Sequence, residues 1–187
     1  HCAAFMAATM SSDLDNTDTV KIFYEDTLAN GIKVLPPDVN ASDYRFVPVD
    51  RKTIRYGLGA VKGVGEPAVR AILAAHEKGG DFRDLFDFCE RVDRRMVNRR
   101  VIEALIRAGA MDTLPGHKGL DRAQLMATVA LAMEAAEQAA ANAMQGGLFD
   151  LMPEAAGAAP EFAKVRAWTE RERLKEEKLA IGFFLSG

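Results

Sequence analysis

The chain has 187 residues, of which 49% are apolar and 27% are charged, and its net charge is −3. These values suit a folded protein that can bury a core without the help of disulfide bonds. Its longest uncharged runs, such as residues 138–149, reach 12 residues and are too short to cross a bilayer. We therefore expect no membrane contact.

The ends of the chain and its cysteines indicate a cytoplasmic protein. The first ten residues are apolar but lack a basic leader, so no signal peptide is expected. The chain begins with His rather than Met, which suggests that it is a piece of a longer protein. Cys2 and Cys89 are too few for a metal cage and are typical of reduced thiols.

The first 57 residues predict two short helices and three short strands. The first helix is apolar, and the second has N-cap candidates at 15–17 and a stop signal at 30–31. Two of the strands flank a polar turn at 50–52 and predict a β-hairpin. The expected spans are a helix over 2–11, a helix that ends before 30–31, and strands over 32–35, 44–49 and 53–57.

From residue 58 onward the apolar periodicity is helical. Residues 145–165 are rich in Gly, Pro and Ala and predict a linker. A charged helix over 168–179 and a strand over 181–185 are expected after it. The other expected helices lie near 58–62, 66–78, 83–91, 97–108 and 119–143.

These elements predict a mostly α fold with a small β-hairpin element, built around a tandem helix-hairpin-helix-like domain. Three divisions are expected. Residues 1–57 form an N-terminal segment with the β-hairpin, residues 58–118 form a paired helix-hairpin-helix region, and residues 119–187 form a long helix, a loop and a C-terminal helix.

The distribution of charge indicates a nucleic-acid partner although the net charge is negative. Residues 51–78 carry six basic and two acidic side chains, and residues 91–122 carry eight basic and four acidic ones. The rest of the chain is mainly acidic. Two basic islands of this kind are consistent either with solvated helix faces or with contacts to phosphate groups.

No catalytic centre is predicted in this chain. His1, His76 and His117 are scattered and lack the spacing of metal ligands. The acidic run at 13–18 faintly resembles a calcium loop but lacks its Gly and Glu, so helix capping explains it better. Phosphate-binding loops, nucleophile elbows and paired carboxylates are not found either. We therefore expect no catalytic residue, no metal site and no cofactor here.

The first basic island contains a helix-hairpin-helix pattern. Gly63 and Gly65 allow a tight turn, and Val64 between them can anchor that turn in the core. The backbone N–H groups at the start of the next helix can then face a DNA phosphate, and Lys62 adds a positive charge. Such a hairpin binds the backbone of duplex DNA and does not read its sequence. The alternative is an ordinary turn between two core helices.

The second basic island repeats this arrangement without glycines. A helix at 83–91 and a helix at 97–108 are joined by a basic turn whose arginine side chains suit phosphate oxygens. The two hairpins could pack as a pair and contact both strands across a groove. The alternative is a solubilising loop. The DNA-contacting residues predicted in this island are Arg94, Arg95, Asn98, Arg99 and Arg100.

A third motif lies where the long helix meets the linker. Gln145 is followed by Leu148 and Phe149, which is the pattern of a peptide that docks into the hydrophobic pocket of a sliding clamp. An apolar pair in a polar segment otherwise has no partner and is a liability. The alternative is that both side chains fold back onto the body of the protein.

Taken together, these residues resemble the alpha (polymerase) subunit of bacterial DNA polymerase III, the C-family replicative polymerases. The resemblance covers essentially the whole chain. It departs from the family at Cys2, where Pro is frequent, and at 146–147, where two glycines loosen the clamp peptide. The matching strings are FMAA (5–8), DLDNT (13–17), LPPDVN (35–40), YGLGAVKGVGE (56–66), LFDFC (85–89), NRRV (98–101), LIRAGAMD (105–112) and IGFFLSG (181–187).

The resemblance implies the end of the fingers followed by the clamp-binding domain. This region would bind duplex DNA non-specifically and tether the polymerase to the beta sliding clamp. The family's catalytic aspartates lie in an upstream palm domain and match no residue here, so the magnesium that the reaction needs would be bound elsewhere in the parent protein. Other replicase subunits would bind outside this region. Two alternatives are a helix-hairpin-helix module of a DNA repair protein and a helical scaffold that does not bind DNA.

Overall fold

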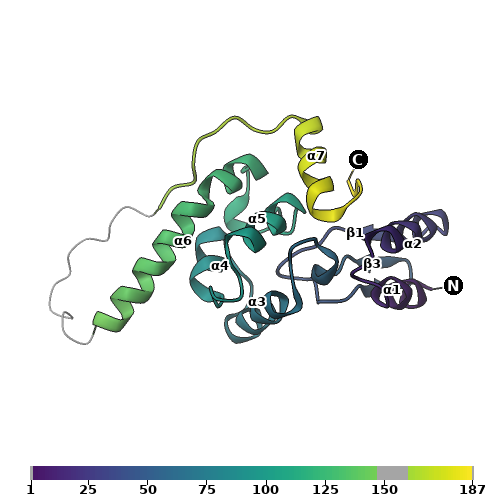
Figure 1. Cartoon of the computed structure of the whole chain (residues 1–187), viewed down its shortest axis with the longest axis horizontal. Coiled ribbons are helices and arrows are strands. Elements are labelled where there is room, and N and C mark those ends of the chain that lie inside the picture. The colour runs from purple at the N-terminus through teal and green to yellow at the C-terminus, as the bar shows by residue number, and fades with distance from the viewer. Residues whose placement is uncertain (1, 147–159, 187) are drawn as a thin grey trace.

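A computed structural model describes residues 2–146 and 160–186 of the chain. Within these residues it contains seven α-helices, two 3-10 turns and one three-stranded sheet. The sheet and the first two helices lie at one end of the molecule, α3 to α5 occupy the middle, and α6 extends to the far end (Figure 1). The prediction of a mostly helical fold with a small β element is confirmed.

The N-terminal end contains α1 (Ala3–Ser11), α2 (Thr17–Ala29) and the sheet. Asn16 begins α2 by accepting the N–H of Thr19 at 3.1 Å, as the capping interpretation of the acidic run predicts. The predicted hairpin is present but shorter, with β2 (Val47–Asp50) antiparallel to β3 (Thr53–Arg55). The predicted strand near 32–35 is β1 (Lys33–Leu35), which pairs in parallel with β3. The strand order is therefore β1-β3-β2.

The first predicted helix of the middle region, over 58–62, is only a 3-10 turn, η1 (Leu58–Ala60). A methyl group on Gly59 would overlap the ring of Tyr44, so the chain passes close to another segment here and cannot wind into a full helix. The remaining helices of this region match the prediction within three residues at each end. They are α3 (Glu66–Gly79), α4 (Leu85–Arg91) and α5 (Arg99–Arg107).

After the 3-10 turn η2 (Pro115–His117), the long helix α6 (Arg122–Gln145) begins at a capping box formed by Asp121 and Gln124. It packs against α4 and α5. The last helix, α7 (Glu170–Ile181), packs against α5 and brings the C-terminus close to α2 (Figure 1).

The strand predicted over 181–185 is wrong. Ile181 is the last residue of α7, and Gly182 ends the helix with a left-handed backbone (φ 97°). Farther along, the backbone N–H groups of Leu185 and Ser186 donate to the carboxylate of Glu177 at 3.0 and 3.1 Å. These two N–H groups therefore bind a side chain and not the carbonyl groups of a neighbouring strand.

One continuous hydrophobic core extends through these elements, from Ala3 to Phe183. Its centre is aromatic: the ring of Phe82 lies 4.9 Å from that of Phe88, and Phe162 packs on Phe86 and on His117. The division into 1–57, 58–118 and 119–187 stays a prediction. In the part of the chain that the structure describes, no helix has both the length and the hydropathy needed to cross a membrane.

Candidate nucleic-acid interface

The first hairpin is a tight turn anchored by two buried valines. Val61 and Val64 are buried, and the N–H of Val64 donates to the carbonyl of Val61 at 3.2 Å. Lys62 and Gly63 between them are exposed. Gly63 has φ of 85°, a conformation that side chains with a Cβ rarely adopt. The sequence prediction that Val64 anchors this turn is confirmed.

The N-terminus of α3, which follows this turn, is open. Its N-cap is Gly65, which has no side chain to accept the N–H groups of the first turn. Glu66 lies in that turn, but its carboxylate is paired with Arg70 at 2.6 Å. Backbone donors and the positive end of the helix dipole therefore face solvent at this point.

The second turn is also anchored by a buried valine, but it is closed by its own side chains. Val97 is fully buried, in the position that Val64 has in the first turn, and its N–H donates to the carbonyl of Asp93. The Asp93 carboxylate pairs with the Arg95 guanidinium at 3.0 Å, and this hydrogen bond lowers the pKa of Asp93. Asn98 caps α5 by accepting the N–H of Val101 at 3.1 Å.

The arginine side chains of the second island differ in their exposure and in whether they are paired with an acidic residue. Arg99 is paired with Glu103 at 2.9 Å, whereas Arg100 is exposed and has no hydrogen bond or ion pair to the described residues. Arg94 is half-buried, and its Nη1 atom is enclosed without a hydrogen-bond partner in the described part of the chain. Arg94 lies near the buried thiol of Cys89, whose pKa burial raises to about 12.

The two hairpins meet at one hollow of about 440 Å³. The first hairpin contributes Lys62 and Gly63, and the second contributes Asn98 and Arg100. Gly63 sits directly on α5, since a methyl group there would lie 4.0 Å from Cβ of Ala104. The other predicted DNA-contacting residues do not line this hollow: Val64, Gly65, Arg94, Arg95 and Arg99.

Sequence reasoning missed the part that α7 plays in this site. Leu179 and Ala180 line the hollow, and the carbonyl of Ala180 accepts the N–H of Lys62 at 2.7 Å. Arg107 also lines it and pairs with Glu176 of α7 at 2.8 Å. These contacts join segments far apart in the chain, so no local pattern could have predicted them.

A buried ionic cluster holds α7 in this position. Glu177 is 1% exposed and lies 3.5 Å from the guanidinium of Arg122, which is itself buried. Arg122 pairs with Asp112 at 2.7 Å and donates to the carbonyl of Arg107. Ser186 donates its hydroxyl to Glu177 at 2.8 Å. Arg122 of α6 and Glu177 of α7 therefore form a buried ion pair beside the C-terminal end of α5.

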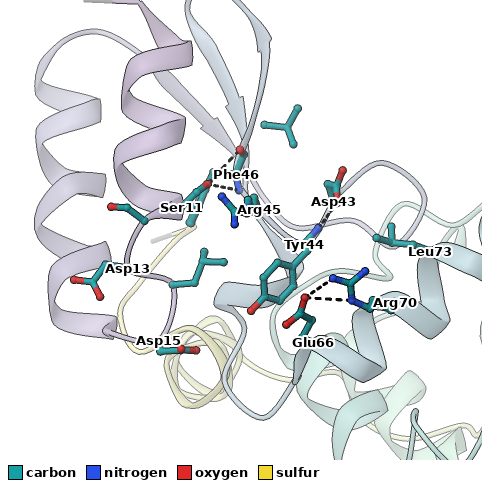
Figure 2. Close-up of a pocket in the computed structure, with 13 residues that line it drawn as sticks. Ser11, Asp13, Asp15, Asp43, Tyr44, Arg45, Phe46, Glu66, Arg70 and Leu73 are labelled. Carbon is teal, nitrogen blue, oxygen red and sulfur yellow. Dashed lines mark hydrogen bonds and ion pairs between the residues drawn. The ribbon is translucent and has the colours of Figure 1, made fainter.

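Another hollow, of about 700 Å³, lies beside the N-terminus of α3 (Figure 2). Asp13 and Asp15 from the α1–α2 turn line one side, the Glu66–Arg70 pair lines the other, and the ring of Tyr44 lies between them. Among the described residues, no group of His, Cys, Asp and Glu side chains is arranged to hold a metal ion. Asn16, within the same run, caps α2.

The predicted clamp peptide falls only partly within the structure. Gln145 is the last residue of α6 and is exposed. Leu148 and Phe149 lie outside the described residues. Their docking role stays a prediction.

A family model described as a helix-hairpin-helix motif matches residues 31–125 of the chain, which include both hairpins and the hollow between them. The chain belongs to the helix-hairpin-helix family. This confirms the helix-hairpin-helix pattern predicted from Gly63 and Gly65.

This helix-hairpin-helix chain is also similar to one segment of several longer proteins. It is 56% identical over 185 residues to the DNA polymerase III subunit alpha of Neisseria meningitidis serogroup B. It is 45% identical to that of Vibrio cholerae and 42% identical to that of Escherichia coli K12, each over 188 residues. Each match covers 99% of the chain but only 16% of the relative. The chain is thus homologous to one segment of these subunits, as the sequence resemblance predicted.

Proposed function

We propose that this chain is the part of a replicative DNA polymerase subunit that binds duplex DNA without regard to sequence. The observation that supports this most is the meeting of the two hairpins: Lys62 and Gly63 share one hollow with Asn98 and Arg100. Phosphate groups along a duplex can contact both hairpins at such a junction. The family and the relatives support the same assignment.

The two hairpins would bind phosphate by different chemistry. The open N-terminus of α3 offers backbone N–H groups and the helix dipole, and Lys62 adds a cation. The second turn would contribute arginines, because Asn98 already satisfies the N-terminus of α5. Arg95 and Arg99 are held by Asp93 and Glu103, so their guanidinium groups are oriented before DNA arrives.

The segment after α6 would tether the polymerase to its sliding clamp. Gln145 is exposed at the end of α6, where its amide could reach a partner, and it precedes Leu148 and Phe149 by three and four residues. Tethering of this kind makes each return to the DNA an intramolecular event, which raises the effective concentration of the polymerase at the primer end.

Nucleotide transfer would belong to other parts of the longer protein. The reaction class of such a subunit is metal-assisted displacement at a phosphate, for which magnesium held by paired carboxylates is the expected cofactor. We expect this chain alone to incorporate no nucleotide. Contacts to other replicase subunits would likewise lie outside it.

The duplex assignment is tested by neutralising charge in the hairpins. Lys62→Ala, Arg95→Ala and Arg100→Ala in one chain should weaken binding to several unrelated duplexes equally, because all three side chains are exposed in the hairpins. The slope of log K against log salt should fall by about one unit per lost phosphate contact, because fewer counterions are released. Fluorescence anisotropy over a range of salt concentrations measures both effects.

A matched control removes three charges elsewhere. Arg51, Lys52 and Arg171 are exposed and line none of the four hollows described in the structure. Changing them to Ala removes the same net charge from the chain, so any smaller loss of binding separates local contacts from overall charge. If the hairpin variant binds duplex as tightly as the parent at low salt, the hairpins are not the DNA site.

A further inference from the structure

A third hollow, of about 240 Å³, lies between α2 and the turn that follows α7. Its lining combines two lysines with aromatic rings. The residues that line it are Lys21, Tyr24, Glu25, Lys178, Gly182, Phe183 and Phe184.

The two phenylalanines of this turn differ in their surroundings. Phe183 is buried, and its ring lies 5.0 Å from that of Tyr24. Phe184 is 49% exposed, and the ammonium group of Lys178 lies 5.4 Å from its ring centroid. A large apolar ring is therefore displayed at the surface beside a cation.

The backbone that carries Phe184 is fixed on both sides. Gly182 ends α7 in the left-handed conformation before it. After it, the N–H of Leu185 donates to Glu177 at 3.0 Å, and the carbonyl of Leu185 accepts the hydroxyl of Tyr24 at 3.1 Å. The backbone position of Phe184 is consequently fixed although its ring is half-exposed, so little backbone ordering is needed when a ligand binds.

This hollow adjoins the first hairpin. A methyl group on Gly182 would lie 3.1 Å from Cε and 3.2 Å from Nζ of Lys62, so the ammonium of Lys62 stands at the same glycine that lines the hollow. Lys21 on the opposite side is only loosely paired with Glu25, at 3.9 Å. Lys178 therefore lies over the exposed ring, and Lys62, which also lines the proposed duplex site, lies at Gly182 on the edge of this hollow.

We propose that Phe184 stacks on an unpaired base of single-stranded DNA that continues from the duplex held by the hairpins. Lys62 and Lys178 would bind the phosphates on either side of that base. An aromatic surface flanked by cations is the chemistry that binds single strands without sequence preference, because every base has a π-face. This inference rests on the proposed duplex binding and extends it to the junction between duplex and single strand.

The test compares a blunt duplex with the same duplex carrying a single-stranded extension that contains 2-aminopurine. The parent chain should bind the extended duplex more tightly than the blunt one, and its binding should change the 2-aminopurine fluorescence. Phe184→Leu should weaken binding to the extended duplex about fivefold or more and leave the blunt duplex unaffected. Phe184→Tyr, which keeps the ring, should restore both the affinity and the fluorescence change.

Phe5→Leu provides the matched control, since Phe5 on α1 is exposed to a similar degree at 55%. It should alter binding to neither duplex. The inference is overturned if the parent binds both duplexes equally, or if Phe184→Leu weakens both to the same extent; duplex binding itself would still stand. If the parent binds neither duplex, the proposed function fails as well.

Discussion

Gly63 sets the geometry of the first hairpin through its backbone. Its φ of 85° is strained for a β-branched residue, although a side chain there would meet only Cβ of Ala104 at 4.0 Å. Gly63→Val should therefore lower the free energy of unfolding by roughly 1–3 kcal/mol and weaken duplex binding, because relief of the strain would move the turn. Urea unfolding and anisotropy with duplex DNA measure the two effects.

Gly65→Ala is the control for this prediction. Gly65 has an ordinary φ of −73°, and a methyl group there would lie in van der Waals contact with Cδ of Pro67 at 3.7 Å. The free energy of unfolding of the Gly65→Ala chain should therefore differ little from that of the parent. Unaltered duplex binding by a folded Gly63→Val chain would show that the shape of this turn does not matter for DNA.

His117 makes the stability of the fold depend on pH. Its Nε2 accepts the N–H of Leu85 at 2.9 Å and its Nδ1 donates to the carbonyl of Met111 at 2.7 Å, so the buried ring is neutral. Burial lowers its pKa. The unfolded chain therefore binds the proton more readily than the folded chain, and stability rises with pH in the window between the two pKa values.

The expected result is a loss of stability in acid. The contribution of His117 should be complete above the unfolded pKa, about 6.5, and should be lost as pH falls through the lower folded pKa. Urea unfolding between pH 8 and pH 5 measures this. His117→Gln should be less stable at pH 8 and less sensitive to pH. Identical pH profiles for the two chains would contradict the assignment.

At the scale of elements, local signals predicted three of the four strands and all the helices except the one expected over 58–62. Asn16 lies in the predicted N-cap run and does begin α2, whereas the capping role of Asp121 and the helix stop at Gly182 were not predicted. The strand predicted over 181–185 failed because its backbone donors bind the side chain of Glu177. The parallel pairing of β1 with β3 depends on distant segments, so local patterning could not predict it.

Glu177 should be the residue on which the position of α7 depends. Its carboxylate is buried, accepts three hydrogen bonds from the C-terminal turn and lies beside Arg122. Glu177→Ala would leave Arg122 with one acidic partner fewer in the interior and should lower the free energy of unfolding by about 3 kcal/mol or more. Thermal and urea unfolding of the variant test this.

The neighbouring Glu176 supplies the comparison. It forms a partly exposed pair with Arg107, so Glu176→Ala should cost only about 1 kcal/mol or less. Equal destabilisation by the two substitutions would mean that burial of the Glu177 carboxylate does not determine its contribution.

For the molecule as a whole, the sequence predicted the two hairpins and their packing as a pair, but not the part that α7 plays in the site. The glycine turn and the basic turn are local patterns, and the structure contains both. Their convergence on one hollow depends on packing between the first hairpin and α5, and the roles of Arg107 and Ala180 depend on where α7 returns. The contact between Lys62 and Ala180 joins residues more than 100 positions apart, so it leaves no local signature.

The clamp peptide is tested on the whole chain with its sliding clamp. Truncation of Leu148 or Phe149 to Ala should each weaken clamp binding by about 2 kcal/mol or more, and Gln145→Ala by about 1 kcal/mol. The melting temperature should hardly change, whereas a core role for Phe149 would cost about 3 kcal/mol of stability. Surface plasmon resonance measures the clamp affinity and calorimetry measures the stability, so together they distinguish clamp docking from a core role.

Leu151→Ala with Met152→Ala is a suitable control, because it removes neighbouring apolar side chains that the motif does not include. Clamp affinity that survives the Leu148→Ala/Phe149→Ala double substitution would falsify the tether.

The contacts of α7 also impose an order on synthesis. Tyr24 donates to Leu185, which leaves the ribosome 161 residues later, and Lys62 donates to Ala180. Until the last helix emerges, the nascent chain cannot cover the surfaces of α2 and α5 that α7 and its turn protect. We expect those surfaces to be bound by chaperones during translation. In a chain stalled on the ribosome before residue 177, the N–H of Lys62 in the first hairpin would lack its acceptor, the carbonyl of Ala180.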